Sequence, residues 1–203
     1  MKARILALMA SFFLGACAGT PLTQERGPQE IGNNGLVVLS VTQGKEKRAL
    51  GVFYLKQTHK HLMRQLTPYL GELFGKRDFT NPDGALWVLE LEPGTHQIDG
   101  WGVRYNTGLG EGVFQPRGCP PLTFQVRSGE VIYLGNLHME TFMVRNIFGL
   151  KVLGKGYPMF RNERVRDVAK FQEKYPKFSN RPVQTRLLDF SEWRKFQELE
   201  SEQ

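Results

Sequence analysis

The sequence predicts a mainly β protein: an antiparallel β-sandwich with one or two C-terminal α-helices. Between residues 35 and about 152, apolar residues come in short runs that Gly, Pro, Asn and Asp separate, a pattern typical of many short strands. Two sharp turn signals, Glu92-Pro93-Gly94 and Ser128-Gly129-Glu130, each lie between two such runs and indicate hairpins. Short strands joined in this way favour an antiparallel sandwich or barrel over a parallel sheet with crossover helices.

The candidate strands share short apolar runs bounded by turn residues, and one of them alternates clearly. Phe124 and Val126 alternate with Gln125 and Arg127, as expected for a strand with one buried face. Seven strands are predicted, at residues 36–41, 50–56, 86–91, 96–103, 122–126, 131–137 and 141–147.

The C-terminal residues change to a helical pattern. Asn162 is a candidate N-cap for a helix from residue 163 to about 174, with Pro176 ending it. Its apolar residues recur at spacings of three or four, at Val165, Val168, Phe171 and Tyr175. Ser191 is a candidate cap for a second, short helix that places Trp193, Phe196 and Leu199 near one face. We expect both helices to cover a face or an edge of the sheet; the alternative is that one docks on a partner or lies on a lipid surface.

The N-terminal residues 1–16 have the three parts of a secretory signal peptide. Lys2 and Arg4 form a positive start, residues 5–14 are apolar, and small residues follow. An apolar run of about ten residues spans about 15 Å as a helix, which is short of the roughly 20 residues that cross a bilayer. We therefore expect a cleaved signal and not a permanent transmembrane anchor.

The end of this signal, Leu14-Gly15-Ala16-Cys17, resembles the lipobox of bacterial lipoproteins. The resemblance implies cleavage between Ala16 and Cys17, attachment of diacylglycerol to the Cys17 thiol, and a protein held on a membrane by its acyl chains, such as palmitate. Each buried methylene contributes about 0.8 kcal/mol, so two or three chains hold a protein that one chain would release. Ala18 stands where an aspartate commonly retains such lipoproteins at the inner membrane, which favours the outer membrane, facing the periplasm. The alternative is an ordinary signal peptide with a chance cysteine.

Four regions are expected along the chain. Residues 1–16 are the signal peptide, and residues 17–34, rich in Gly, Pro, Thr, Gln and Asn, are expected to form a flexible tether. The β-sandwich domain is expected over residues 35–153, followed by a basic C-terminal segment with helices over residues 154–203.

Two segments also resemble a group of uncharacterised bacterial lipoproteins. They are residues 86–96, LWVLELEPGTH, and residues 124–135, FQVRSGEVIYLG. The resemblance implies a small transthyretin-like or immunoglobulin-like β-sandwich, and it brings no activity and no catalytic residues.

The charge distribution argues against nucleic-acid binding. Removing Lys2 and Arg4 with the signal lowers the formal net charge from +7 to +5, and no basic run, zinc-finger spacing or aromatic RNA-binding signature is present. Residues 155–195 hold eleven Lys or Arg against five Asp or Glu, a surplus that suits anionic lipid head groups or an anionic cell-wall polymer. Because acidic residues are interspersed, a solvated helix face is the preferred interpretation.

The four histidines are the candidate metal ligands. His59 and His61 would lie on the same side of a strand, but two ligands do not make a site, and His96 and His138 join them only if the fold brings them close. No cofactor is therefore expected, and His59 and His61 stay weak metal candidates.

Cys119 lies in the rigid stretch Gly118-Cys119-Pro120-Pro121, and acylation of Cys17 would leave it without a disulfide partner in this chain. It is either a buried small apolar residue or an exposed thiol, and we favour burial because cysteine is among the most often buried residue types.

The leading functional hypothesis is a lipid-anchored, non-enzymatic envelope protein with a role in binding or envelope assembly. The Gly-x-Ser-x-Gly nucleophile elbow is absent, and the glycine-rich stretch from Gly108 to Gly112 lacks the Lys-Ser/Thr end of a phosphate loop. The alternative is a His-based metal or small-ligand binding protein or hydrolase in the periplasm. A third hypothesis is a structural partner that uses the C-terminal helices.

Overall fold

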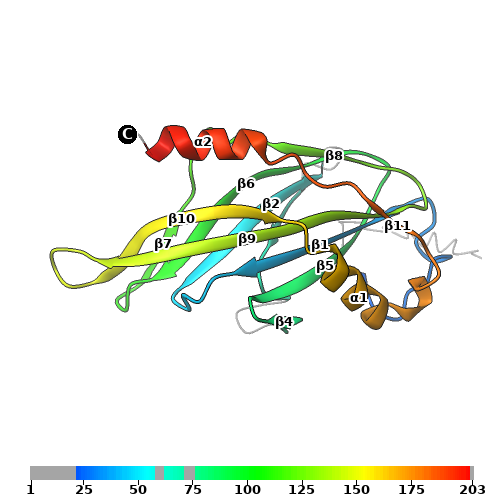
Figure 1. The fold of residues 1–203 in the computed structure, drawn as a ribbon, viewed down its shortest axis with the longest axis horizontal. Coiled ribbons are helices and arrows are strands. Elements are labelled where there is room, and N and C mark those ends of the chain that lie inside the picture. The colour runs from blue at the N-terminus through cyan, green and yellow to red at the C-terminus, as the bar shows by residue number, and fades with distance from the viewer. Residues whose placement is uncertain (1–21, 58–61, 71–75, 202–203) are drawn as a thin grey trace, which may run out of the picture.

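Two β-sheets packed face to face form the body of the protein, which is shown by a computed structural model that describes residues 22–57, 62–70 and 76–201 (Figure 1). The first sheet has the strand order β10-β9-β1-β5-β4, with β11 also paired to β9. The second sheet has the order β3-β2-β6-β7, with β8 also paired to β6. The predicted fold class, a mainly β sandwich with C-terminal helices, is confirmed.

The strands are β1 (Gly35–Gln43), β2 (Ala49–Gln57), β3 (Leu62–Leu66), β4 (Phe79–Thr80), β5 (Asp83–Leu91), β6 (Gly94–Asn106), β7 (Glu111–Phe114), β8 (Leu122–Val126), β9 (Val131–Arg145), β10 (Lys151–Arg161) and β11 (Val183–Thr185). The helices are α1 (Arg164–Lys174), the short 3-10 helix η1 (Pro176–Phe178) and α2 (Ser191–Ser201). Neither α-helix in the described part of the chain has the length and apolar character needed to span a membrane.

The first sheet is buried on both faces around β1. Its inner face, with Val37 and Leu39, packs against the second sheet, while its outer face, with Leu36 and Val38, packs under α1 and η1. A strand buried on both faces must be apolar at nearly every position, and all nine residues of β1 are buried. This explains why residues 35–43 show an apolar run and no alternation.

The pairing of β1 with β9 is parallel, and so is that of β11 with β9. Between β1 and β9 the chain forms β4 and β5 of the first sheet and β2, β3, β6, β7 and β8 of the second. Both predicted turns do connect two strands, but neither forms a hairpin. Glu92-Pro93-Gly94 joins β5 to β6 and Ser128-Gly129-Glu130 joins β8 to β9, and each pair of strands belongs to different sheets.

The β9–β10 hairpin differs most from the prediction. Two separate strands were predicted over residues 131–147, whereas β9 runs unbroken from Val131 to Arg145. Its register against β1 shifts at one point, where Tyr133 pairs with Val38 but Gly135 pairs with Leu39. Gly135 has a φ of +113° and lies against the Phe160 ring, so the backbone there suits glycine alone. β10 was not predicted at all, and the expected domain boundary between residues 153 and 154 falls inside it.

The segment before β1 packs on the domain. Leu22 and Ile31 are buried against the outer face of the first sheet, and Tyr175 donates a hydrogen bond from its hydroxyl to the Leu22 carbonyl over 3.0 Å. Arg26 forms an ion pair with Glu90 of β5. The predicted flexible tether over residues 17–34 is therefore wrong from residue 22 onward, because these residues have apolar and charged partners that the composition did not reveal.

The two predicted helices form close to their expected bounds. The N-cap position of α1 is Glu163 and not Asn162, although the Asn162 side-chain oxygen accepts a hydrogen bond from the Arg164 backbone amide over 3.3 Å. α1 covers the outer face of the first sheet, and α2 runs beside the edge strand β10 (Figure 1).

Trp193 packs α2 into the sandwich. Trp193 is fully buried, its ring stacks on Phe53 at 6.2 Å and lies 5.0 Å from that of Phe190, and its indole nitrogen donates to the Pro120 carbonyl. Leu199 on the same helix is exposed. The Trp193 side chain thus packs into the core between the two sheets, beneath α2.

We expect Trp193→Ala to lower the free energy of unfolding by about 3–5 kcal/mol, because it leaves a cavity the size of an indole ring in the core. Urea unfolding measures this. The matched change Leu199→Ala, on an exposed position of the same helix, should stay within about 0.5 kcal/mol of the unchanged protein. Equal effects of the two changes would show that α2 does not belong to the core.

Candidate functional site

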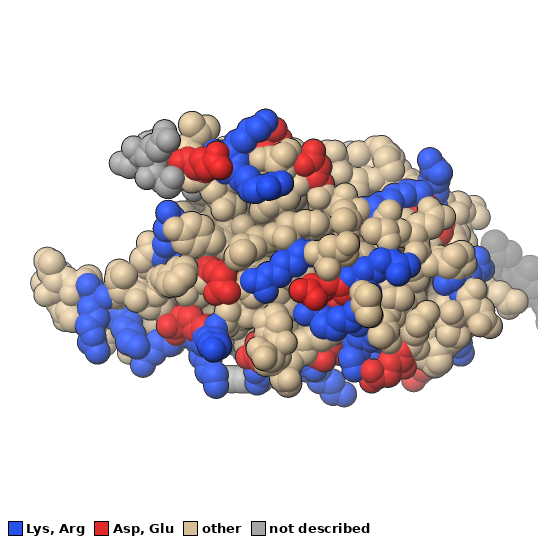
Figure 2. Space-filling view, viewed as in Figure 1, with Lys and Arg blue, Asp and Glu red and all other residues tan. Residues whose placement is uncertain are grey.

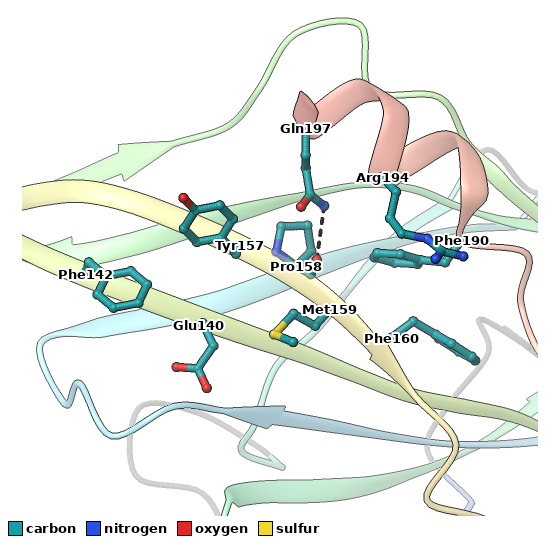
Figure 3. Close-up of a pocket in the computed structure, with 9 residues that line it drawn as sticks. All are labelled: Glu140, Phe142, Tyr157, Pro158, Met159, Phe160, Phe190, Arg194 and Gln197. Atoms are coloured by element: carbon teal, nitrogen blue, oxygen red, sulfur yellow. Dashed lines mark hydrogen bonds between the residues drawn. The ribbon is translucent and has the colours of Figure 1, made fainter. Parts of the chain in front are cut away.

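A groove along β10 is the candidate functional site. It has a volume of about 570 Å³ and lies where β9 and β10 face α2 (Figure 3). Its lining residues are Glu140, Phe142, Tyr157, Pro158, Met159, Phe160, Phe190, Arg194 and Gln197. This volume falls within the range of about 300–1,000 Å³ that is usual for small-molecule sites.

The groove is mainly apolar because the hairpin carries large side chains that no other element covers. Phe142 is 56% exposed and Met159 is 41% exposed, and the Phe142 ring meets Tyr157 edge to face at 6.0 Å. At the other end Phe160 stacks on Phe190, with ring centroids 5.9 Å apart. Contiguous exposed apolar side chains of this kind mark ligand or partner sites in soluble domains.

Three polar side chains border the groove. Gln197 donates from its amide to the Pro158 carbonyl over 3.0 Å, which fixes α2 to the edge of β10 (Figure 3). Glu140 contacts His138 and, at 3.9 Å, Arg161. Arg194 is the one Lys or Arg among the described residues that line the groove, and its charge interacts with that of Asp189. A second cation lies close by, because the Lys155 ammonium sits over the Tyr157 ring, 4.5 Å from its centroid.

A buried polar cluster lies beside the groove, on the outer face of the first sheet. At its centre Asp167 of α1 accepts hydrogen bonds from the Ser40 hydroxyl at 2.6 Å and the Tyr133 hydroxyl at 2.9 Å. The Arg166 guanidinium donates to the other carboxylate oxygen at 2.8 and 2.9 Å. These bonds tie α1 to β1 and β9, and so fix the helix that covers the sheet.

The cluster continues to the groove through a hydroxyl, an imidazole and a carboxylate. The Thr42 hydroxyl lies 2.7 Å from Nδ1 of His138, whose Nε2 lies 2.9 Å from the Glu140 carboxylate. These are the residue types of a nucleophile relay. However, the Thr42 side chain is fully buried, so no substrate reaches its hydroxyl in this conformation.

Burial governs the titration of these groups. Loss of solvent raises the pKa of the Asp167 carboxyl, against the opposing effect of the Ser40 and Arg166 hydrogen bonds. The same cause raises the pKa of the Tyr133 hydroxyl, with a further contribution from the Asp167 charge. Burial lowers the pKa of His138, and its hydrogen bond to Glu140 opposes that shift. The imidazole is therefore held toward its neutral form.

The residues predicted from the sequence are only partly brought together. Ala16, Cys17, His59 and His61 lie outside the described residues. His96 belongs to β6 in the second sheet, where its ring stacks on Phe124, whereas His138 belongs to β9 in the first. Within the described ranges, no group of three or more His, Cys, Asp or Glu is placed to hold a metal ion. The His-based site stays a prediction.

Cys119 is half-buried and packs against the core between the sheets. This position is closer to the favoured interpretation, a small apolar residue, than to an exposed thiol.

The groove residues were missed because β10 was missed. Residues 155–161, KGYPMFR, carry a proline and two glycines nearby, which weaken the strand pattern. Apolar residues occupy both sets of alternate positions, Tyr157 and Met159 on one and Pro158 and Phe160 on the other, so no alternation of apolar and polar residues marked this stretch as a strand.

The comparisons with known proteins add no function. No model of a known protein family and no curated protein sequence matches the chain. A leucine-rich repeat protein from Bacteroides thetaiotaomicron, among the solved structures, is 11% identical, with a TM-score of 0.27 over 52% of this chain. The match spans 14% of the length of that protein. A likeness of this size does not define a shared fold, so function is argued from this chain's own residues.

We expect Asp167→Ala to destabilise the protein by about 3–5 kcal/mol, because it leaves the Arg166 guanidinium and two hydroxyls without their buried acceptor. Chemical unfolding checks this. Glu173→Ala, which removes an exposed ion pair with Lys170 on the same helix, should cost at most about 1 kcal/mol. A loss at Asp167 no larger than at Glu173 would contradict the anchoring role of the cluster.

Proposed function

We propose that this protein is a lipid-anchored, non-enzymatic envelope protein whose groove along β10 binds the acyl chain of an anionic amphiphile. The observation that carries the binding proposal is the apolar lining of the groove, in which the exposed Phe142 and Met159 continue to the half-buried Phe160 and the buried Phe190. The lipobox-like sequence at Cys17 supports the anchor and a location in the envelope, on the periplasmic side of the outer membrane.

The chemistry of the groove favours an acyl chain with a negative head group. Its apolar lining consists of phenylalanine and tyrosine rings, a proline and a methionine, which make dispersion contacts with methylene groups. Its rim carries Arg194, whose guanidinium suits a carboxylate or phosphate because it presents paired N–H donors. The Glu140 carboxylate is engaged by His138 and Arg161 and so repels an anion less than a solitary carboxylate would.

The anchor is tested by replacing Cys17 with Ser. We expect loss of labelling by a palmitate analogue and release from the membrane fraction, because the acyl chains have no other attachment point in the lipobox. Metabolic labelling and fractionation of cells measure both. Cys119→Ser is the matched control and should keep label and location; persistent labelling of the Cys17 variant would overturn the anchor.

The groove is tested by photo-crosslinking a diazirine fatty acid to the full-length protein in isolated membranes. Labelled peptides should contain residues 157–160 or 190–197. Met159→Glu should reduce that labelling about tenfold or more, because it places a charge against the chain. Arg194→Ala should weaken labelling by the fatty acid while leaving a diazirine fatty alcohol unchanged.

The control for the groove test is Val113→Glu, an exposed position on β7 outside the groove, which should not change the labelling. The binding proposal is wrong if the label maps elsewhere in the chain or if Met159→Glu does not reduce it. Neither result would contradict the anchor proposal.

A further inference from the structure

Three strand connections meet at one end of the molecule, on the left of Figure 1. They are residues 44–48 between β1 and β2, residues 107–110 between β6 and β7, and residues 146–150 between β9 and β10. The first two are joined by a hydrogen bond from the Asn106 amide to the Arg48 carbonyl. The β9–β10 connection, called the tip loop below, projects beyond the other two (Figure 1).

The tip loop holds two large apolar side chains in solvent. Ile147 is 93% exposed and Phe148 is 79% exposed, and Leu109 in the neighbouring connection is 81% exposed. The loop is ordered by its own hydrogen bonds. The Asn146 side chain accepts from the backbone amides of Phe148 and Leu150 at 3.0 Å each. These hydrogen bonds fix the loop conformation, and that conformation keeps the side chains of Ile147 and Phe148 in solvent.

The flanks of the tip loop are positively charged. Residues 141–160 contain three cations, Arg145, Lys151 and Lys155, and no acidic residue. The connection at residues 44–48 adds two lysines and an arginine against one glutamate. In Figure 2 Lys and Arg atoms lie directly beside the uncharged end of this projection.

An apolar tip with a cationic collar is complementary to an anionic bilayer. Apolar side chains enter the interface between head groups and acyl chains, and Lys and Arg near the surface attract anionic lipids. Protein interfaces, in contrast, are depleted of lysine, whereas the collar here includes Lys151 and Lys155. The narrow projecting shape also offers little area to a protein partner.

We propose that the tip loop docks on an anionic phospholipid bilayer, with Ile147 and Phe148 in the interface and Arg145, Lys151 and Lys155 on the head groups. This site is distinct from the acyl anchor and adjoins the groove, where Lys155 lies over the Tyr157 ring. It gives the protein a second membrane contact that depends on lipid charge.

Together with the proposed acyl anchor at Cys17, the tip contact fixes how the protein is oriented on the membrane. Leu22 bonds to Val88, which lies level with Tyr133 across the sheet, and β9 runs about 40 Å further to Arg145 at about 3.3 Å per residue. Five residues from Cys17 to Leu22 reach at most about 17–18 Å. Anchor and tip therefore meet one bilayer only when the long axis lies along the membrane.

The test places an environment-sensitive nitrobenzoxadiazole (NBD) dye on the protein through Ile147→Cys, in a Cys119→Ser background, with the acylated protein reconstituted in vesicles. In vesicles of equal parts phosphatidylglycerol and phosphatidylcholine, the dye emission should shift to the blue and nitroxide-labelled lipids should quench it. Both effects should be much smaller in phosphatidylcholine alone. The same dye at Val165, an exposed position on α1, should show neither.

A charge-reversed variant separates the collar from the apolar tip. Lys151→Glu combined with Lys155→Glu should remove the blue shift in phosphatidylglycerol vesicles, whereas Lys195→Glu on α2 should leave it unchanged. If the dye at residue 147 emits as it does in water when phosphatidylglycerol vesicles are present, the proposal is wrong. This holds even if the tip crosslinks to a protein in cells, because the partner is then a protein and not a bilayer. Equal signals in both vesicle types overturn the role of the charges. Flotation of the protein with vesicles reports the anchor separately, so the two proposals fail independently.

Discussion

Burial of β1 on both faces is the constraint on which the rest of the structure depends. Val37, Leu39 and Val41 of this strand face the second sheet, while Leu36 and Val38 face the opposite side. Both faces of the first sheet must therefore pack against other elements. The second sheet covers one face. The other is covered by α1, by η1 and by the segment that begins at Leu22. The Asp167 cluster then fixes α1 in place with buried hydrogen bonds, whose loss would leave several polar groups unsatisfied at once.

The same constraint explains where the candidate sites lie. Residues 131–139 of β9 are all buried. From Phe142 onward the strand extends beyond the elements that pack on its two faces, and its side chains are exposed or half-exposed. A two-stranded ribbon is marginally stable alone, so the extended hairpin gains from any surface that covers its apolar residues. α2 covers part of the edge of β10 and thereby forms one wall of the groove. The uncovered remainder ends in the tip loop, and the groove and the tip are consecutive parts of one hairpin.

Individual elements show how far sequence patterns reach. Residues 122–126 alternate because only one face of β8 meets the core, and the strand was predicted at its observed bounds. Phe171 and Trp193 are buried as the helical spacing predicted, whereas Val165 and Leu199, predicted on the same faces, are exposed. His138 and Glu140 flank the apolar Met139 in the same way, yet residues 138–140 fell between the two predicted strands, 131–137 and 141–147. They belong to one strand, in which Thr42 of β1 contacts Asn136 and His138, and His138 contacts Glu140.

By itself, the sequence determined the mainly β class, the position of most strands and both helices, since hydrophobic period and turn residues are local properties. It also contains the lipobox-like residues at Cys17, which carry the anchor proposal. Only the tertiary structure decided the parallel pairing of β1 with β9, the packing of residues 22–34 on the domain and the groove between β10 and α2. Each of these depends on contacts between residues far apart in the chain, and a local pattern records which side chains are apolar but not which surface will cover them.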